Sequence, residues 1–228
     1  AASDVYKRQP YDLILTSFPH FVNRLRNDGK NCEYFKIGFD KRILSKIPPN
    51  DRDIDFSFVG GISKYHNYAS KNIEYLIKNA KLQVYGYGVN KLPFNSNIRR
   101  HHKGERWGLD MYNVLSRSKI SFNRHINVAE NNANNMRLYE ATGMGSLLLT
   151  DRKDNLRQLF EEDREIVTYE SKEEALDKYN YLINKPEELA KIAKAGQLRT
   201  LKEHTYETRI KELIQIITKY LKVESWED

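Results

Sequence analysis

The sequence has almost no cysteine: Cys32 is the only one among 228 residues. A single cysteine excludes an intrachain disulfide framework and a cysteine-rich zinc site. Long hydrophobic runs are missing too, because the densest apolar stretch, residues 146–150, is far shorter than the roughly 18 residues that a membrane helix needs. The chain is nevertheless not polar throughout. Hydrophobic residues make up 39% of it and aromatic residues 11%, so we expect a folded core rather than wholesale disorder.

What the sequence does have is an excess of positive charge. Thirty-eight lysines and arginines against 31 aspartates and glutamates give a formal net charge of +7 and an isoelectric point near 9.2. Such a balance suits anionic ligands, whether nucleic acid, an anionic membrane face or nucleotide phosphates. The basic residues are spread along the chain rather than clustered. We therefore expect no nucleic-acid partner.

Residues 1–9 are treated separately. Residues 4–9 match the translation of a widely used sequencing-transposon end, so we interpret residues 1–9 as an artefact of sequence assembly and exclude them from the fold argument. An ordinary basic tail is the alternative. On the first interpretation the chain is a fragment whose true N-terminus is missing.

Strand and helix patterns alternate from Tyr11 onwards. A first unit is predicted to contain a strand at 12–16, a helix from 19 to about 27 and a strand at 33–37. Residues 40–55 follow as a polar linker, marked by Pro48 and Pro49. Beyond it, the prediction is five strands, four helices and a long polar loop: strands at 56–59, 82–85, 119–123, 146–150 and 165–168, helices at 68–79, 109–116, 136–142 and 156–160, and the loop at 89–106.

Three further helices are predicted to finish the chain, beginning near Ser171, Pro186 and Thr205. The alternation as a whole predicts an α/β fold: a Rossmann-like, three-layer parallel sheet with helices on both faces. Ligands of such sheets bind beyond the carboxyl ends of the strands. The loops at the predicted ligand edge are therefore 60–67, 86–106, 124–136 and 151–155.

The best functional signal lies where the helix at 136–142 begins. A helix start offers unpaired amides and the positive end of a dipole, so a diphosphate can sit there. Glu140 lies just over one turn inside and can accept two hydrogen bonds from the vicinal hydroxyls of a ribose. Arg137 precedes it by three residues, so a helix-surface ion pair is the alternative. The pattern alone leaves both interpretations open.

The stretch from Arg137 to Asp151 resembles the helix–glycine–strand signature of group 1 glycosyltransferases, and is closest to the branch of spore-maturation-type proteins. Four other stretches agree with the resemblance: residues 58–61, 85–88, 119–125 and 204–209. The resemblance covers about residues 55–215. It implies the nucleotide-sugar-binding C-terminal domain of a two-domain GT-B enzyme, residues 49–204, with a remnant of the N-terminal acceptor-side domain and linker at 10–48. Residues 205–228 would be a C-terminal helix that crosses back to the N-terminal domain.

By the same resemblance the chain is part of a cytoplasmic transferase. It would move a sugar from a nucleotide-diphosphate sugar to an unknown acceptor, such as a cell-envelope glycan or a protein, with retention of configuration and without metal or cofactor. In the superfamily a Glu-x7-Glu pair faces the donor, and the second Glu binds ribose. Glu140 matches that second position, but the first falls on Asn132. The loop that holds Asn132, Asn134 and Asn135 would therefore have to hold the sugar.

Two further loops hold candidates for substrate binding. Gly61 lets the backbone approach a ligand, and Lys64 can approach the diphosphate; a tight turn with a solvated lysine is the alternative. Lys103 and Gly104 lie where the superfamily places recognition of the base, and can touch it through backbone atoms. A solvent-exposed loop is the alternative there. The neighbouring His101–His102 pair has no carboxylate cluster beside it, so we expect no metal site.

Asn123, Arg124 and His125 follow a predicted strand and are expected to face the cleft. His125 can polarise the donor or bind a sugar hydroxyl, with a structural histidine as the alternative. His20 ends a strand of the first unit, where the resemblance lets it contact donor or acceptor. These two histidines are the candidate catalytic residues.

Two other functions stay open on the sequence. A nucleotide-sugar epimerase shares the two-domain architecture, and a phosphate-responsive α/β module without catalysis would tolerate Asn132. One further expectation concerns the last helix, where apolar residues recur at helical spacing: Ile210, Leu213, Ile214, Ile217 and Leu221. We expect this stripe to be exposed, and the chain by itself to bind nucleotide, to transfer no sugar and to self-associate.

Overall fold

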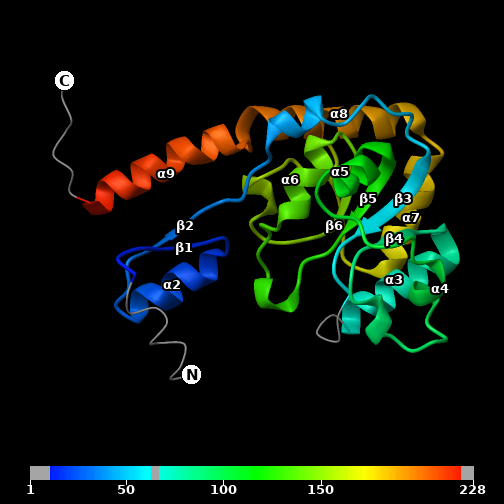
Figure 1. The fold of residues 1–228 in the computed structure, drawn as a ribbon, viewed down its shortest axis with the longest axis horizontal. Coiled ribbons are helices and arrows are strands. Elements are labelled where there is room, and N and C mark those ends of the chain that lie inside the picture. The colour runs from blue at the N-terminus through cyan, green and yellow to red at the C-terminus, as the bar shows by residue number, and fades with distance from the viewer. Residues whose placement is uncertain (1–10, 63–66, 222–228) are drawn as a thin grey trace.

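The computed structural model describes residues 11–62 and 67–221, which form a small and a large unit (Figure 1). The small unit consists of β1 (Ile14–Thr16), α2 (Pro19–Asn27) and β2 (Cys32–Tyr34). The two strands are parallel, with Ile14 opposite Cys32. Val22, Leu25 and Cys32 form its buried cluster. This core is small, and a two-stranded sheet alone is marginal in water, so the unit depends on its neighbours.

The large unit is built on a parallel sheet of five strands in the order β4-β3-β5-β6-β7. Its strands are β3 (Ile54–Val59), β4 (Gln83–Tyr85), β5 (Ser118–Asn123), β6 (Leu147–Asp151) and β7 (Val167–Tyr169). The register pairs Phe56 with Ile120 across β3 and β5, and Asn123 with Thr150 across β5 and β6. The carboxyl ends of β5 and β6 therefore lie side by side.

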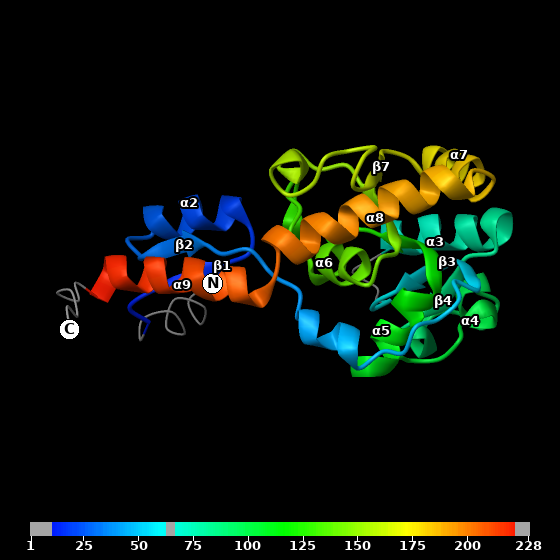
Figure 2. The ribbon, with the colours of Figure 1, turned by 90° about the horizontal axis from the view of Figure 1, so that it is seen from above.

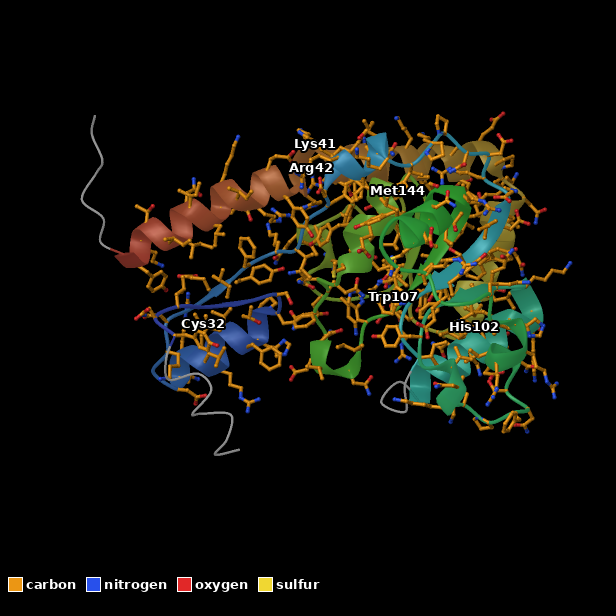
Figure 3. All side chains as sticks on the ribbon, viewed as in Figure 1. Cys32, Lys41, Arg42, His102, Trp107 and Met144 are labelled. Carbon is orange, nitrogen blue, oxygen red and sulfur yellow. The ribbon has the colours of Figure 1, made fainter. Side chains whose placement is uncertain are left out.

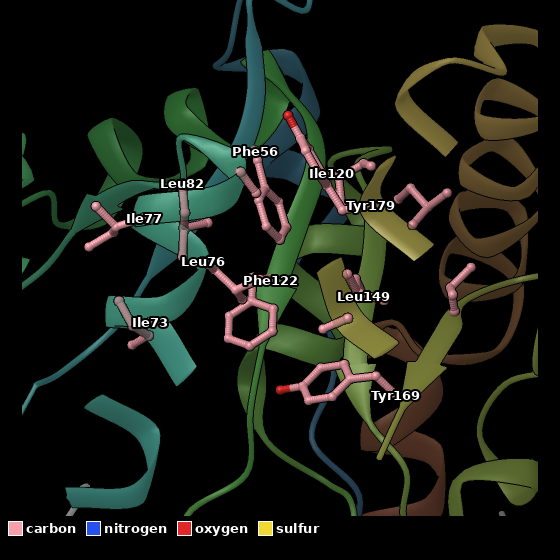
Figure 4. Close-up of a cluster of buried hydrophobic side chains, with 14 of the residues drawn as sticks. Phe56, Ile73, Leu76, Ile77, Leu82, Ile120, Phe122, Leu149, Tyr169 and Tyr179 are labelled. Atoms are coloured by element: carbon pink, nitrogen blue, oxygen red, sulfur yellow. The ribbon is translucent and has the colours of Figure 1, made fainter. Parts of the chain in front are cut away.

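Helices cover both faces of this sheet. One face packs on α3 (Asn67–Ala80) and α7 (Lys172–Ile183), and the other on α5 (Gly108–Arg117) and α6 (Met136–Gly143). Figure 4 shows the first of these layers, where Phe56 stacks on Tyr179 with ring centroids 4.5 Å apart. Because both sides of the central strands are buried, Leu147–Leu149 of β6 are all fully enclosed. The three-layer α/β prediction is confirmed.

The long helix α8 (Pro186–Glu203) joins the two helical layers (Figure 2). Leu189 near its start belongs to the first layer's core, while Thr200 near its end shares a hydrogen bond of 2.6 Å with Thr142 of α6. Gly196 is needed at the crossing, because a Cβ there would lie 2.2 Å from the Glu165 carbonyl oxygen. The last helix, α9 (Tyr206–Leu221), then leaves the large unit and runs beside the small one.

The chain passes between the two units twice, near Phe39 and near His204–Tyr206, and these two segments are hydrogen-bonded to each other. Phe39 donates its amide to the His204 carbonyl at 2.8 Å, and Tyr206 donates to the Phe39 carbonyl at 3.0 Å. At the far end of α9, Lys219 and Tyr220 both contact Glu33 of β2 at 2.8 Å. The small unit is therefore held by the crossing at one end of α9 and by Glu33 at the other.

Several predicted element bounds need correction. The expected loop at 89–106 contains a 3-10 turn, Val89–Lys91, and a short helix α4 (Asn97–His101). Ser96 caps α4 by accepting from the Arg99 amide, and the Glu74 carboxylate of α3 accepts from the amides of Asn97 and Ile98. Four strands also differ from the prediction by two residues or more at one end: β1 begins at Ile14, β2 ends at Tyr34, β3 begins at Ile54 and β7 runs from Val167 to Tyr169.

The expected linker at 40–55 is not free. It contains a 3-10 turn, Lys41–Ser45, and apolar side chains of this segment pack on the core of the large unit. Farther along, Arg52 donates to the carbonyls of Ser116, Ser118 and Met144 at 2.7–3.1 Å. The segment therefore belongs structurally with the large unit. The boundary at 48/49 stays a prediction.

Candidate functional site

Glycines bring the ends of β3 and β4 unusually close together. Gly86 has φ of +135°, and a Cβ there would lie 1.9 Å from the Gly60 carbonyl oxygen. Tyr87 covers Gly61, where a Cβ would lie 2.6 Å from the Tyr87 ring. Tyr87 in turn stacks on Trp107, with centroids 5.1 Å apart (Figure 3 labels Trp107). The result is a close-packed backbone layer covered by two exposed aromatic rings. Lys64 lies outside the described residues.

The segment 102–104 runs alongside the end of β4. The amide of Lys103 donates to the Val84 carbonyl at 2.8 Å, and the carbonyl of Gly104 accepts from the Gly86 amide at 3.3 Å. The His102 ring also donates to the Gly86 carbonyl at 2.7 Å. Backbone contact between this segment and a base would thus fall to the Lys103 carbonyl and the Gly104 amide. The side chain of Lys103 is exposed.

The start of α6 is fixed by asparagines on neighbouring elements. Asn135 is the N-cap, and its side chain accepts from the Leu138 amide at 3.2 Å. Its own amide group donates to Asn123 at the end of β5, at 3.1 Å. Asn123 also donates to Thr150 of β6 at 2.9 Å. The helix start is therefore anchored to the carboxyl ends of two adjacent strands. The amides of the first helical turn, which follow the cap, have no carbonyl partner four residues earlier within the helix.

Arg137 and Glu140 form the anticipated ion pair, at 2.9 Å, but not on a helix surface. Their side chains are only 14% and 6% exposed. Tyr112 of α5 adds a contact of 3.4 Å from its hydroxyl to the Glu140 carboxylate. Burial lowers the pKa of the Arg137 guanidinium, with the Glu140 charge opposing that shift. Burial and then the Glu140 charge raise the pKa of Tyr112. A buried charge pair therefore sits one turn below the helix start.

Asn134 links the two units. Its side-chain oxygen accepts from the Tyr139 hydroxyl at 2.7 Å and from the Ile37 amide at 3.2 Å. Its nitrogen donates to the Ser17 carbonyl of the small unit at 2.8 Å. The residue is only 1% exposed. These contacts favour a role in holding the units together over direct contact of Asn134 with a sugar.

His20 reaches the same loop from the small unit. Its Nδ1 accepts from the Asn132 side-chain amide at 3.1 Å, so the ring proton resides on Nε2. The ring also packs on Phe21, with centroids 4.3 Å apart. The loop expected to hold the sugar is thereby in contact with the one histidine of the small unit.

His125 lies at the end of β5 beside Asp151 at the end of β6. Its Nδ1 and its backbone amide both donate to the same Asp151 oxygen, at 2.7 and 2.9 Å. Lys153 lies 3.4 Å from the other Asp151 oxygen and donates to the Glu130 carbonyl at 2.9 Å. Arg124, between Asn123 and His125, is half-buried. Asp151 was not among the candidate residues expected from the sequence, although the pairing of adjacent strand ends was a signal for it.

Buried nitrogens without a hydrogen-bond partner concentrate among these side chains. Within the described part of the chain they include Nε2 of His20, Nε2 of His125 and Nε of Arg137. Buried polar groups are nearly always paired, so such atoms call for an explanation, and binding of a ligand is one.

Two other findings concern the described residues alone. They contain no group of three metal-ligating side chains, and no helix long and apolar enough to cross a membrane.

A family profile described as glycosyl transferase-like matches residues 63–215, more than half of the chain. The chain belongs to this glycosyl transferase-like family. Among curated proteins no sequence matches it significantly. The family membership agrees with the glycosyltransferase resemblance of the signature at Arg137–Asp151.

Solved structures place this glycosyl transferase-like chain in the GT-B fold. Sucrose-phosphate synthase from Thermosynechococcus elongatus superposes with a TM-score of 0.67 at 9% identity, covering 93% of this chain and 59% of that one. Anabaena HepE in complex with UDP-glucose gives 0.68 at 12%, covering 91% and 64%. The pneumococcal O-GlcNAc transferase GtfA, in complex with UDP and GlcNAc, gives 0.59 at 12%, covering 94% and 46%.

The chain thus spans between about half and two thirds of the length of these structures. At such low identities the likeness shows the fold alone. The five-stranded parallel sheet with helices on both faces is consistent with the C-terminal domain of the GT-B fold.

Proposed function

We propose that the chain binds a nucleotide-diphosphate sugar at the start of α6 and forms the donor side of a glycosyltransferase. The observation that carries the proposal is the geometry of Arg137. Its guanidinium is enclosed at the first turn of α6, and its Nε has no partner among the described residues. A diphosphate at the helix start offers the oxygens that such a donor needs, in addition to the favourable dipole.

Glu140 supports the proposal from one turn below. Its carboxylate lies within contact distance of Arg137 and Tyr112, and among the described residues Arg137 is the one cation paired with it. If a diphosphate takes over Arg137, the carboxylate gains the vicinal hydroxyls of a ribose as new donors. Charge-assisted bonds of this kind are the stronger class of hydrogen bond. UDP and UDP-glucose bound to HepE make uridine nucleotides the natural first probes.

The reaction would break the bond between the anomeric carbon and the diphosphate oxygen and form a bond from that carbon to an acceptor oxygen. The proton of the acceptor hydroxyl would leave with the diphosphate or pass to a base. Positive and amide groups stabilise charge that develops on such a leaving group, and on this proposal Arg137 and the α6 amides would do so. Retention of configuration, independence of metal, relation to spore-maturation-type proteins and a cytoplasmic location belong to the proposal.

Calorimetric titration of the chain with UDP, GDP and their sugars tests the proposal. We expect saturable binding of one nucleoside diphosphate, which Arg137→Ala weakens much more than it weakens binding of the corresponding nucleoside. A matched control is Arg157→Ala, which removes an exposed cation outside this site. Failure of every nucleotide to bind a folded chain would refute the proposal.

A further inference from the structure

The environment of His125 constrains its ring more tightly than that of an ordinary surface histidine. The side chain is completely enclosed. One oxygen of Asp151 receives both the ring Nδ1 and the backbone amide of His125, which fixes the ring in position and in rotation about its axis. Lys153 holds the other oxygen, at 3.4 Å. Lys153 also donates to the Glu130 carbonyl and so ties this group to the Asn-rich loop.

The carboxylate decides which nitrogen carries the ring proton. Burial alone would raise the pKa of Asp151, but the hydrogen bonds from His125 and the charge of Lys153 outweigh it, so the pKa lies below its usual value. An ionised carboxylate only accepts hydrogen bonds. Nδ1 therefore carries a proton in this contact, and a neutral ring held in this way has its lone pair on Nε2.

That lone pair has no donor among the described residues, although Nε2 is buried. Of the two parts of a nucleotide-diphosphate sugar nearest to this site, the phosphates and the sugar, only one can supply the hydrogen-bond donor that Nε2 lacks. A phosphate presents acceptor oxygens to a lone pair and would be repelled, whereas a sugar hydroxyl can donate to it. His125 follows Asn123, whose side chain binds the N-cap of α6, where the diphosphate is proposed to sit. The sugar is the group attached next to that diphosphate.

We propose that Asp151 is a positioning residue that holds His125 in its Nδ1–H form, so that Nε2 accepts a hydrogen bond from a hydroxyl of the donor sugar. This inference rests on the proposed function and deepens it. It gives the chain a sugar-recognising nitrogen in a loop where Asn132 replaces the superfamily's first Glu. Asp151 itself does not touch the sugar.

A first experiment reads the tautomer directly, without any ligand. Long-range ¹H–¹⁵N spectra of the full chain with labelled histidine distinguish the two neutral forms of each ring. We expect His125 to carry its proton on Nδ1, and Asp151→Asn to disturb this. The side chain of this variant has one acceptor oxygen and one NH2 group. If the oxygen accepts from Nδ1 and the amide of His125, the NH2 group faces Lys153. If the oxygen faces Lys153 instead, the NH2 group faces the two His125 donors. A proton on Nε2 of His125 in the parent chain would overturn the inference.

A second experiment measures the sugar's contribution to binding. The parent chain is titrated with UDP, UDP-glucose, UDP-N-acetylglucosamine, GDP and GDP-mannose. The nucleotide sugar whose affinity most exceeds that of its own nucleoside diphosphate is then used for the variants. We expect Asp151→Asn to reduce that preference about five-fold, as the loss of one hydrogen bond would. Affinity for the bare nucleoside diphosphate should change by less than about two-fold. His125→Phe, which keeps a ring but removes Nε2, should behave the same way if Asp151→Asn does not fold.

Asp154→Asn is the matched control, because this exposed carboxylate lies three residues away. We expect it to keep the full preference. Equal losses for nucleotide and nucleotide sugar in Asp151→Asn would reduce Asp151 to a structural role and overturn the inference alone. A parent chain that prefers no sugar would overturn it as well. A parent chain that binds no nucleotide would instead remove the proposed function, and the inference with it.

Discussion

Arg209 donates a hydrogen bond of 2.7 Å from its guanidinium to Nδ1 of His204. A guanidinium only donates, so Nδ1 of His204 must be an unprotonated acceptor. The other ring nitrogen donates to the Leu159 carbonyl at 2.8 Å. Arg209 also donates to the Ile37 carbonyl, at 3.0 Å. A neutral histidine therefore lies at the junction of α8 and α9, where the two units are connected.

Stability should depend on pH through His204. Burial, with the Arg209 charge, lowers the pKa of its folded form from 6.5 to about 4, despite the Leu159 bond. Between these values the unfolded chain binds a proton that the folded chain does not, so stability falls as pH drops below 6.5. The loss approaches roughly 3 kcal/mol near pH 4. Urea unfolding at pH 7, 5.5 and 4.5 measures it. His204→Gln, which can keep both bonds, should flatten the profile, and an unchanged profile would contradict the assignment.

Asn134→Ala should loosen the connection between the units. The substitution leaves the buried Tyr139 hydroxyl and the Ile37 amide without their acceptor, at a cost of about 2–3 kcal/mol. Hydrogen exchange of the Ile37 amide should accelerate more than that of amides in β5. The control is Asn131→Ala, at an exposed position of the same loop, with an expected change within about 0.5 kcal/mol. Equal effects of the two substitutions would deny Asn134 its linking role.

Glu140→Gln should weaken binding of a nucleoside diphosphate by roughly ten-fold or more, because a charge-assisted acceptor for the ribose is lost. A 2′-deoxy nucleoside diphosphate provides the internal control. The parent should prefer the ribonucleotide, and the variant should bind both forms about equally. Calorimetry with the four combinations gives the coupling directly. If the variant still prefers the ribonucleotide, Glu140 does not hold that hydroxyl.

Gly86→Ala should destabilise the chain severely. The new Cβ would lie 1.9 Å from the Gly60 carbonyl oxygen, on a backbone that already has a φ of +135°. We expect a loss of about 3 kcal/mol or more of unfolding free energy. Gly29→Ala is the matched control, since Gly29 also has a positive φ, of +73°, but open space around it. There the expected cost is only about 1–2 kcal/mol, from backbone strain. Similar urea midpoints for the two variants would contradict the close approach of β3 and β4.

The exposed face of α9 should promote self-association. Ile210, Ile214 and Ile217 are 55%, 59% and 37% exposed, as anticipated for the stripe, whereas Leu213 is half-buried. The side chain of Leu221 lies outside the described residues. Sedimentation velocity should show a concentration-dependent dimer or higher species. The double substitution Ile210→Glu/Ile214→Lys should abolish it while adding a favourable helix pair. A pair of substitutions at the exposed Lys211 and Gln215 is the control and should leave self-association unchanged. A parent chain that stays monomeric would refute the prediction.

The sequence predicted those parts of the fold that depend on local patterning. The alternation of apolar runs and helices gave the parallel sheet, and the signature from Arg137 to Asp151 gave α6 and β6 nearly to the residue. Helix α4 was missed because it has only five residues, too few for a periodic pattern, and only its Ser96 cap is local. Glu74, the acceptor for the Asn97 and Ile98 amides, lies more than 20 residues earlier in the chain. An acceptor supplied from that distance leaves no local pattern.

The site was predictable in its location more than in its partners. Glu140, Arg137 and Asn135 do lie together at the start of α6. The contact of Tyr112 with the Glu140 carboxylate, however, depends on how α5 packs. The role of Asn134 rests on contacts with Ser17 and Ile37, which are 117 and 97 residues away. The contact of Asp151 with His125 was predictable from the sequence. Parallel strands that pair Asn123 with Thr150 also bring the residues that follow them, His125 and Asp151, close together.

The single cysteine gives the small unit a reporter of its own opening. Cys32 of β2 is completely enclosed against Val22 and Leu25 of α2, and burial raises the pKa of its thiol, which keeps it unreactive while the unit is closed. Because no second thiol exists in the chain, a thiol reagent reacts only when this unit opens. The labelling rate then separates local opening of the small unit from global unfolding of the sheet. A bound nucleotide that slows labelling would show that the donor site and the small unit communicate.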